Sequence, residues 1–153
     1  MLAGLVTFFD LLLAALLTGA MFGVFLVFNP KGLDGPLYVR LQQQAVRTLN
    51  TAMPVLGAAT IAVTIAAAIL ARNDGVRFKL LVAGALGFVA AGLITRFLNQ
   101  PINAVMMTWS AAAPPADWTE LRDAWWRWHI ARLLCGVGAL SALILASLTA
   151  ENI

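Results

Sequence analysis

Long apolar stretches separated by short polar segments set the pattern of this chain. A transmembrane helix needs about 20 predominantly apolar residues, because the hydrocarbon core of a bilayer is about 30 Å thick. Four stretches of 16 to 21 residues carry no charged side chain at all. With their flanking residues, they predict four membrane-spanning helices at about residues 3–28, 51–71, 77–98 and 130–149.

Polar sections precede two of these spans. Residues 37–50 and 117–130 are rich in amide, charged and aromatic side chains but contain no turn-forming cluster, so they predict helical extensions of the second and fourth spans. Pro54 lies inside the second helix, where it removes a backbone donor and is expected to bend the helix. Pro101 is expected to end or kink the third helix for the same reason.

The composition agrees with membrane helices rather than with a soluble domain. Hydrophobic residues make up 61% and charged residues 11% of the 153 residues, whereas soluble domains carry about 25% charged residues. The spans also lack the alternating polarity of a transmembrane barrel. We therefore expect an all-α integral membrane four-helix bundle that forms a single domain over residues 1–153. We expect it to be a multi-pass protein in the lipid bilayer of the bacterial inner membrane.

Charge and cysteine content narrow the functional classes. The calculated pI is 9.8, but the basic residues border the spans and form no patch on a soluble fold, so no nucleic-acid partner is expected. Cys135 is the single cysteine, which excludes an internal disulfide and a multi-cysteine metal site. The single histidine, His129, cannot make a zinc site, and the paired Glu-x-x-His motifs of di-iron bundles are missing. No metal site is predicted.

The alternating direction of the spans gathers the polar side chains at one end of the bundle. Helical spacing sorts them onto faces, because positions i, i+3 or i+4, and i+7 point the same way. A charge in a membrane helix usually faces the bundle interior or a cavity. Snorkelling of arginines to the headgroups and an interfacial tryptophan belt are the alternatives. The three candidate faces consist of Gln43, Arg47 and Asn50; of Arg96, Asn99 and Asn103; and of Trp125, His129 and Arg132.

Two further features receive structural interpretations. Gly19 and Gly23 form a G-x-x-x-G pattern, which we expect to pack helices closely inside the bundle. The same pattern is compatible with a homo-oligomer but does not give the number of copies. Asp10, near the start of the first span, is expected to mark the membrane interface close to Arg72 or Arg77.

Two polar segments carry a family resemblance. The R-F-L-N-Q-P-I-N segment at residues 96–103 and the R-D-A-W-W-R-W-H-I-A-R segment at residues 122–132 resemble the DUF1772 family, a group of small four-helix membrane proteins related to anthrone oxygenases. Residues 38–54, which include Tyr38 and Pro54, also look like the second helix of that family. The resemblance covers nearly the whole chain.

The resemblance implies a membrane-embedded oxygenase or related redox enzyme that acts on a lipophilic aromatic small molecule, such as an anthrone or a quinol. It also implies that no metal or flavin cofactor takes part. On this view His129 is the base, and Arg47, Arg96 or Arg132 stabilises the oxyanion. The residues that would bind the substrate are Asn99, Asn103, Gln43, Asn50 and Trp125.

Two other functional classes stay open at this point. The polar end of the bundle also suits a non-enzymatic protein, either a small-molecule carrier or an accessory subunit of a membrane complex. A third reading is a haem- or quinone-binding membrane protein with His129 as the axial ligand. Bound haem would give the purified protein a Soret band, and an accessory subunit would purify with an unrelated partner.

Overall fold

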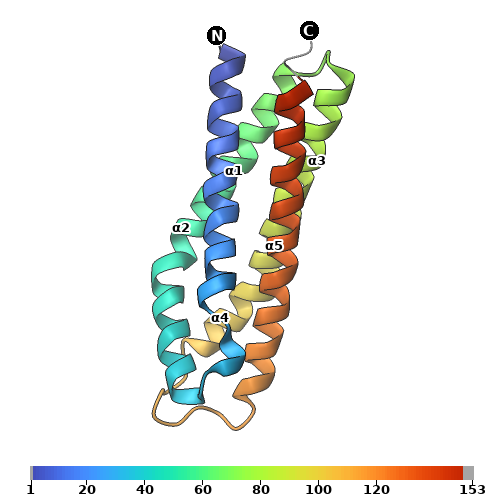
Figure 1. Cartoon of the computed structure of the whole chain (residues 1–153). Helices are drawn as coiled ribbons and strands as arrows, with labels where there is room; N and C mark the ends of the chain where they lie inside the picture. The colour runs from blue at the N-terminus through green and yellow to red at the C-terminus, as the bar shows by residue number, and fades with distance from the viewer. Residues whose placement is uncertain (1, 150–153) are drawn as a thin grey trace.

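Four helical rods form the bundle in the computed structural model, which describes residues 2–149. Each rod packs against two others in the ring order α1, α2, α3, α5, and neighbouring rods run in opposite directions (Figure 1). The predicted all-α four-helix bundle is thereby confirmed. The segments are α1 (Leu2–Val27), the short 3₁₀ helix η1 (Pro30–Gly32), α2 (Gly35–Leu70), α3 (Gly75–Ile94), the π-helical segment η2 (Thr95–Asn99), α4 (Gln100–Met106) and α5 (Trp118–Thr149). The segments α3, η2 and α4 follow one another without a gap and together form the third rod, while α1, α2 and α5 are the other three.

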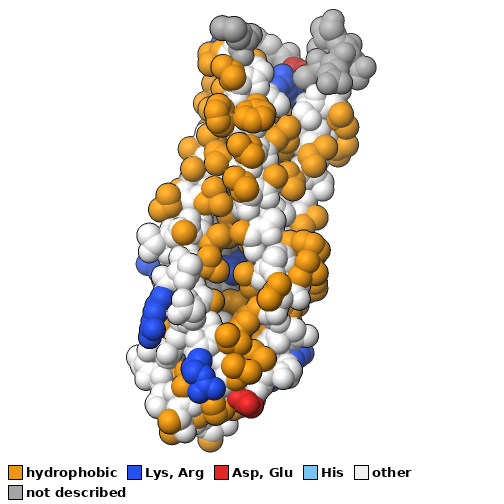
Figure 2. Space-filling view, turned by 60° about the vertical axis from the view of Figure 1, so that its left-hand side comes forward, with side chains coloured by type: hydrophobic (Ala, Val, Ile, Leu, Met, Phe, Trp, Pro, Cys, Tyr) orange, Lys and Arg blue, Asp and Glu red, His pale blue; other side chains and the backbone are white. Residues whose placement is uncertain are grey.

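All four rods are long and apolar enough to cross a membrane. The protein is therefore a multi-pass membrane protein. Hydrophobic side chains cover much of the face seen in Figure 2, as expected for a surface that meets lipid rather than water. The polar sections predicted at residues 37–50 and 117–130 continue without a break into the helices that span, so α2 and α5 are single helices.

Aspartates fix where two of the helices begin. The side chain of Asp34 accepts a hydrogen bond of 2.8 Å from the backbone of Leu37, and that of Asp74 accepts one of 3.2 Å from the backbone of Arg77. Both satisfy a donor that a helix start leaves free. Pro36 is tolerated in the first turn of α2, where no backbone donor is needed.

The two prolines inside helices have different consequences. Pro54 leaves α2 helical on both sides, and α2 changes direction along its length (Figure 1). Pro101 does not end the helical run, because it lies in the first turn of the α-helix α4, directly after a π-helical segment. Residues 95–99 widen into a π-helix in which Gln100 donates its backbone N–H to the carbonyl of Thr95, five residues earlier. This wider turn connects α3 to α4, and π-turns of this kind often occur at functional sites.

Close helix packing uses other glycines than the predicted pair. A Cβ built on Gly19 or Gly23 would meet nothing within 4 Å, so the expectation that this motif packs helices inside the bundle is wrong. The tight contact is instead between α3 and α5. There, a Cβ on Gly87 would lie 2.9 Å from the Cβ of Ala139 and 3.2 Å from the carbonyl oxygen of Cys135.

Asp10 lies inside the bundle rather than at its interface. The residue is buried, and one of its carboxyl oxygens lies 2.6 Å from the hydroxyl of Thr64, which connects α1 to α2. Arg77 donates to the hydroxyl of Thr7 instead, at 2.9 Å. The expected interfacial position of Asp10 beside Arg72 or Arg77 is therefore wrong.

Candidate functional site

A cavity of about 410 Å³ opens among the helices in the half of the bundle that holds the polar side chains. Its walls come from residues 20–28 of α1 and the loop that follows, and from residues 42–54 of α2. Thr95, Asn103, Trp125 and Arg132 complete the wall on the other rods. The wall is mostly apolar, and Figure 2 shows basic atoms in a recess part-way along the hydrophobic face. This size is within the usual range for small-molecule sites.

Arg132 is the charged group of the cavity wall. Its Nη1 donates to the hydroxyl of Thr95 at 3.3 Å, while its Nε and Nη2 lie 3.3 Å and 3.0 Å from Nδ1 of His129. The centre of the guanidinium is also 6.0 Å from the ring centroid of Trp125. Because a guanidinium only donates hydrogen bonds, Nδ1 must be the acceptor, and the proton of the neutral imidazole is on Nε2.

Stacked aromatic rings hold the imidazole of His129 in place. The centroid of the Trp125 ring lies 5.3 Å from that of the imidazole, with an angle of 4° between the two ring planes. For Trp126, the centroid distance is 5.5 Å and the interplanar angle is 17°. His129 is wholly buried and is not part of the cavity wall. Its Nε2 makes no hydrogen bond within residues 2–149, although the ring interacts with the backbone of Met21 on α1. His129 thus presents Nδ1 to Arg132, and it has no direct contact with the cavity, whose wall contains Arg132 instead.

The charge of Arg132 has no acidic partner. Within residues 2–149, the ion pair is Arg122 with Asp123, at 2.9 Å, and no carboxylate lies within 4.0 Å of Arg132. Arg132 is partly buried, and a cation without a counter-ion inside a membrane helix bundle is costly and usually marks a binding site. An anionic oxygen in the cavity would supply the missing partner.

Amide side chains line the cavity at a second position. Gln42 is fully buried in α2 and donates from Nε2 to Oδ1 of Asn103 at 3.2 Å. Asn103 donates in turn to Oδ1 of Asn50 at 3.5 Å. Gln42, unlike its neighbour Gln43, is not among the site residues predicted from the sequence. Its signal was its spacing with the apolar wall residues Val46 and Leu49, at i+4 and i+7.

Two of the predicted amides hold the backbone instead of lining the cavity. Gln43 donates to the carbonyl oxygens of Met106 at 3.1 Å and Trp109 at 2.9 Å, where the chain leaves α4. Asn99, which is wholly buried in the π-helical segment, donates to the carbonyl oxygen of Trp125 at 3.1 Å. Both therefore position parts of the site from outside its wall.

The three arginines do not converge. Arg47 is exposed and lies outside the wall of the 410 Å³ cavity. Arg96 is also exposed and lines a smaller cavity of about 250 Å³ together with Gln100. That smaller cavity shares Arg132 and Thr95 with the larger one. Of the three predicted oxyanion-binding arginines, only Arg132 faces both spaces.

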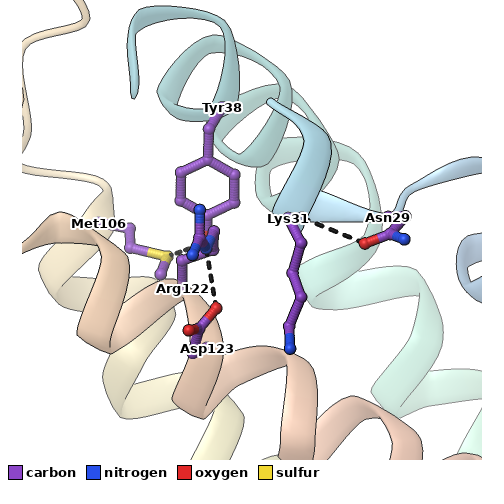
Figure 3. A network of polar contacts seen from close by, with 6 residues as sticks. All are labelled: Asn29, Lys31, Tyr38, Met106, Arg122 and Asp123. Carbon is purple, nitrogen blue, oxygen red and sulfur yellow. Dashed lines mark hydrogen bonds and ion pairs between the residues drawn. The ribbon is translucent and has the colours of Figure 1, made fainter. Parts of the chain in front are cut away.

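A polar and aromatic cluster closes the loop end of the bundle (Figure 3). Tyr38 is fully buried and donates its hydroxyl to the sulfur of Met106 at 3.2 Å. The guanidinium of Arg122 lies 4.9 Å from the ring centroid of Trp118, which itself packs on Tyr38 with ring centroids 5.4 Å apart. Phe28 connects this cluster to the cavity wall, because its ring contacts both Tyr38 and Trp125.

Comparison with protein families adds the decisive observation. The family model described as anthrone oxygenase matches residues 43–142, which is more than half of the chain. The chain belongs to the anthrone oxygenase family. No curated protein and no solved structure matches it.

In this anthrone oxygenase family member, the matched region contains most of the site residues on α2, on the third rod and on α5. It includes most of α2, all of α3, η2 and α4, and the part of α5 that carries Trp125, His129 and Arg132. The cavity wall from α1 lies outside it, as does Gln42. No three His, Cys, Asp or Glu side chains come together as a metal site anywhere in residues 2–149.

The haem reading of His129 does not fit this geometry. An axial ligand needs one ring nitrogen free to face an open space. Nδ1 accepts from Arg132, Nε2 is buried, and two indole rings pack nearly parallel to the imidazole. A porphyrin at His129 would have to displace this packing.

Proposed function

We propose that this protein is a membrane-embedded oxygenase that binds a lipophilic aromatic ketone or phenol as its enolate or phenolate beside Arg132. The observation that carries the proposal is a guanidinium without an acidic partner in the wall of a mostly apolar cavity. The membership of the anthrone oxygenase family supports the same chemistry. The bilayer delivers a lipophilic substrate to such a cavity, and we propose the bacterial inner membrane as its location.

The reaction balances with dioxygen as the only co-substrate. The central methylene carbon of an anthrone loses one proton to give an enolate, whose carbon donates electrons to dioxygen and forms a carbon–oxygen bond. The hydroperoxide that results loses water and leaves a second carbonyl. One methylene group and one dioxygen molecule thus become one carbonyl group and one water molecule. The carbanion itself is the reductant, so the proposal assigns no cofactor.

Arg132 contributes by stabilising the negative oxygen of the enolate. The charge develops at a site where Thr95 and His129 already orient the guanidinium, so little reorganisation is needed when the proton leaves. The mostly apolar wall lowers the local dielectric constant, which strengthens the attraction between the two charges. Removing a donor from such a site typically slows the chemical step about 10²- to 10³-fold.

His129 acts on Arg132 rather than on the substrate in this proposal. Its Nδ1 already accepts hydrogen bonds from Arg132, and a proton added there would place two cations in direct contact. The imidazole is also absent from the cavity wall, whereas a general base must come within hydrogen-bonding distance of the proton it removes. We therefore assign the substrate proton to water and the positioning of the guanidinium to His129.

The test is turnover of anthrone by the detergent-purified protein, followed by oxygen uptake and by the absorbance of the quinone. Arg132→Gln keeps a polar side chain but removes the charge, and we expect turnover to fall about 10²- to 10³-fold. Arg47→Gln is the matched control, because Arg47 is exposed outside the cavity. Unchanged turnover in Arg132→Gln would refute the proposal, whereas tight binding of anthrone without oxygen uptake by the unaltered protein would indicate a carrier.

A further inference from the structure

The cavity has a second polar position, and its hydrogen bonding is incomplete. Gln42 is wholly buried, and its Oε1 is one of the buried side-chain atoms that make no hydrogen bond within residues 2–149. The amide cannot turn around without loss, because its Nε2 donates to Oδ1 of Asn103. The atom without a partner, Oε1, is therefore a hydrogen-bond acceptor. An unpaired buried acceptor costs about 1–3 kcal/mol, which a hydrogen-bond donor on a bound molecule would recover.

The distance between the two polar positions follows from the helix register. Arg132 is hydrogen bonded to Thr95, and Gln42 is hydrogen bonded to Asn103, eight residues further along the same rod. At about 1.5 Å per residue, the two levels are roughly 12 Å apart along the rod. Phe28, Val46 and Trp125 are among the wall residues of the same cavity.

We infer that the buried amide of Gln42, held by Asn103, is a specificity subsite that accepts a hydrogen bond from a hydroxyl group on the substrate, at the far end of the cavity from Arg132. This inference rests on the proposed function, since Arg132 must hold the substrate's anionic oxygen at the other end. Allowing about 3 Å for each hydrogen bond, the two substrate oxygens are roughly 6 Å or more apart. They belong to different rings of a fused aromatic system, and the far oxygen carries a hydrogen.

Two related probes separate donor recognition from general affinity. Anthraflavic acid is a dihydroxyanthraquinone with one hydroxyl on each outer ring, and its monomethyl ether replaces one of the two donors with an acceptor. Dissociation constants are measured with the detergent-purified protein from the change in probe absorbance. We expect the unaltered protein to bind anthraflavic acid about tenfold more tightly than the ether, which is the usual effect of one buried hydrogen bond.

Variants assign that preference to Gln42. Gln42→Leu is expected to bind both probes with about equal affinity, whereas Gln44→Leu, an exposed position on the same helix, keeps the preference. If Gln42→Leu does not fold, Gln42→Met, which has nearly the same length, takes its place. Equal affinity of the unaltered protein for both probes, with binding that still depends on Arg132, would overturn this inference alone. Failure of both probes to bind would count against the proposed function itself.

Discussion

At the scale of single residues, the site is organised around one relationship, in which a neutral imidazole holds a guanidinium. The rings of Trp125 and Trp126 pack nearly parallel to the imidazole of His129, and the fixed ring accepts two donors of Arg132 through Nδ1. The guanidinium therefore has a defined place in the cavity wall without an acidic partner that would neutralise it. This arrangement differs from a catalytic base, whose nitrogen would have to face the substrate.

Substitution of His129 tests this relationship. In His129→Gln, the side-chain oxygen can still accept from Arg132, so we expect kcat for anthrone oxidation within about tenfold of the unaltered protein. His129→Leu leaves the guanidinium unheld and is expected to approach the 10²- to 10³-fold loss of a missing oxyanion donor. If His129 were the general base, Gln and Leu would be equally damaging, and both would remove the same limb of the pH profile.

At the scale of the helices, the π-helical segment and the α3–α5 contact decide where the site residues lie. The wide turn at residues 95–99 places Asn99 against the carbonyl oxygen of Trp125 and Thr95 against Arg132. The rods that carry these residues approach closely, because Gly87 leaves room for Ala139. A shift between α3 and α5 would therefore move both partners of Arg132 relative to each other.

Alanine at Gly87 measures this contact. Its Cβ would lie 2.9 Å from that of Ala139, so the helices must separate slightly. We expect Gly87→Ala to lower the free energy of unfolding by about 1–3 kcal/mol. Gly138→Ala is the matched control on α5, since its Cβ would meet nothing within 4 Å, and the gain in helix propensity should stabilise it by about 0.5–1 kcal/mol. Thermal unfolding in detergent compares the two, and an equal shift of Tm would contradict the account.

At the scale of the whole molecule, the four rods are antiparallel. The start of α1, the end of α5 and the turn between α2 and α3 therefore lie at the same end of the bundle (Figure 1). The loop between α4 and α5 lies at the opposite end, beside the polar cluster of Figure 3. The cavity is in the half of the bundle nearest that cluster. On the proposed function, a substrate dissolved in the bilayer would reach a site whose polar groups lie inside a hydrophobic outer surface.

Cysteine labelling tests this topology. Because Cys135 is the single cysteine, Cys135→Ser gives a background in which Asn73→Cys and Ala112→Cys each introduce one thiol, at exposed positions in the two opposite turns. In sealed vesicles, a membrane-impermeant maleimide should label one of them from outside and the other only after permeabilisation. Labelling of both from the same side would rule out four spans.

The fold followed from the sequence because hydropathy and helix length decide which segments cross a membrane. The site followed only in part. Gln42 and Gln43 are adjacent in the sequence, yet Gln42 lines the cavity whereas Gln43 binds backbone carbonyls. The reason is that successive side chains of a helix point about 100° apart. Similarly, spacing brings His129 and Arg132 together but cannot show which of them faces the cavity. That depends on how α1, α3 and α5 pack around them.

The most direct test of the central claim, that Arg132 holds the enolate, is the absorption spectrum of anthrone mixed with the protein under argon, where oxidation cannot follow. The unaltered protein and Arg47→Gln should both show the long-wavelength band of the enolate. Arg132→Gln should leave the spectrum of the ketone unchanged at the same pH. Formation of the enolate to the same extent in Arg132→Gln would contradict the account. So would oxygen uptake by the unaltered protein that consumes anthrone without any enolate under argon.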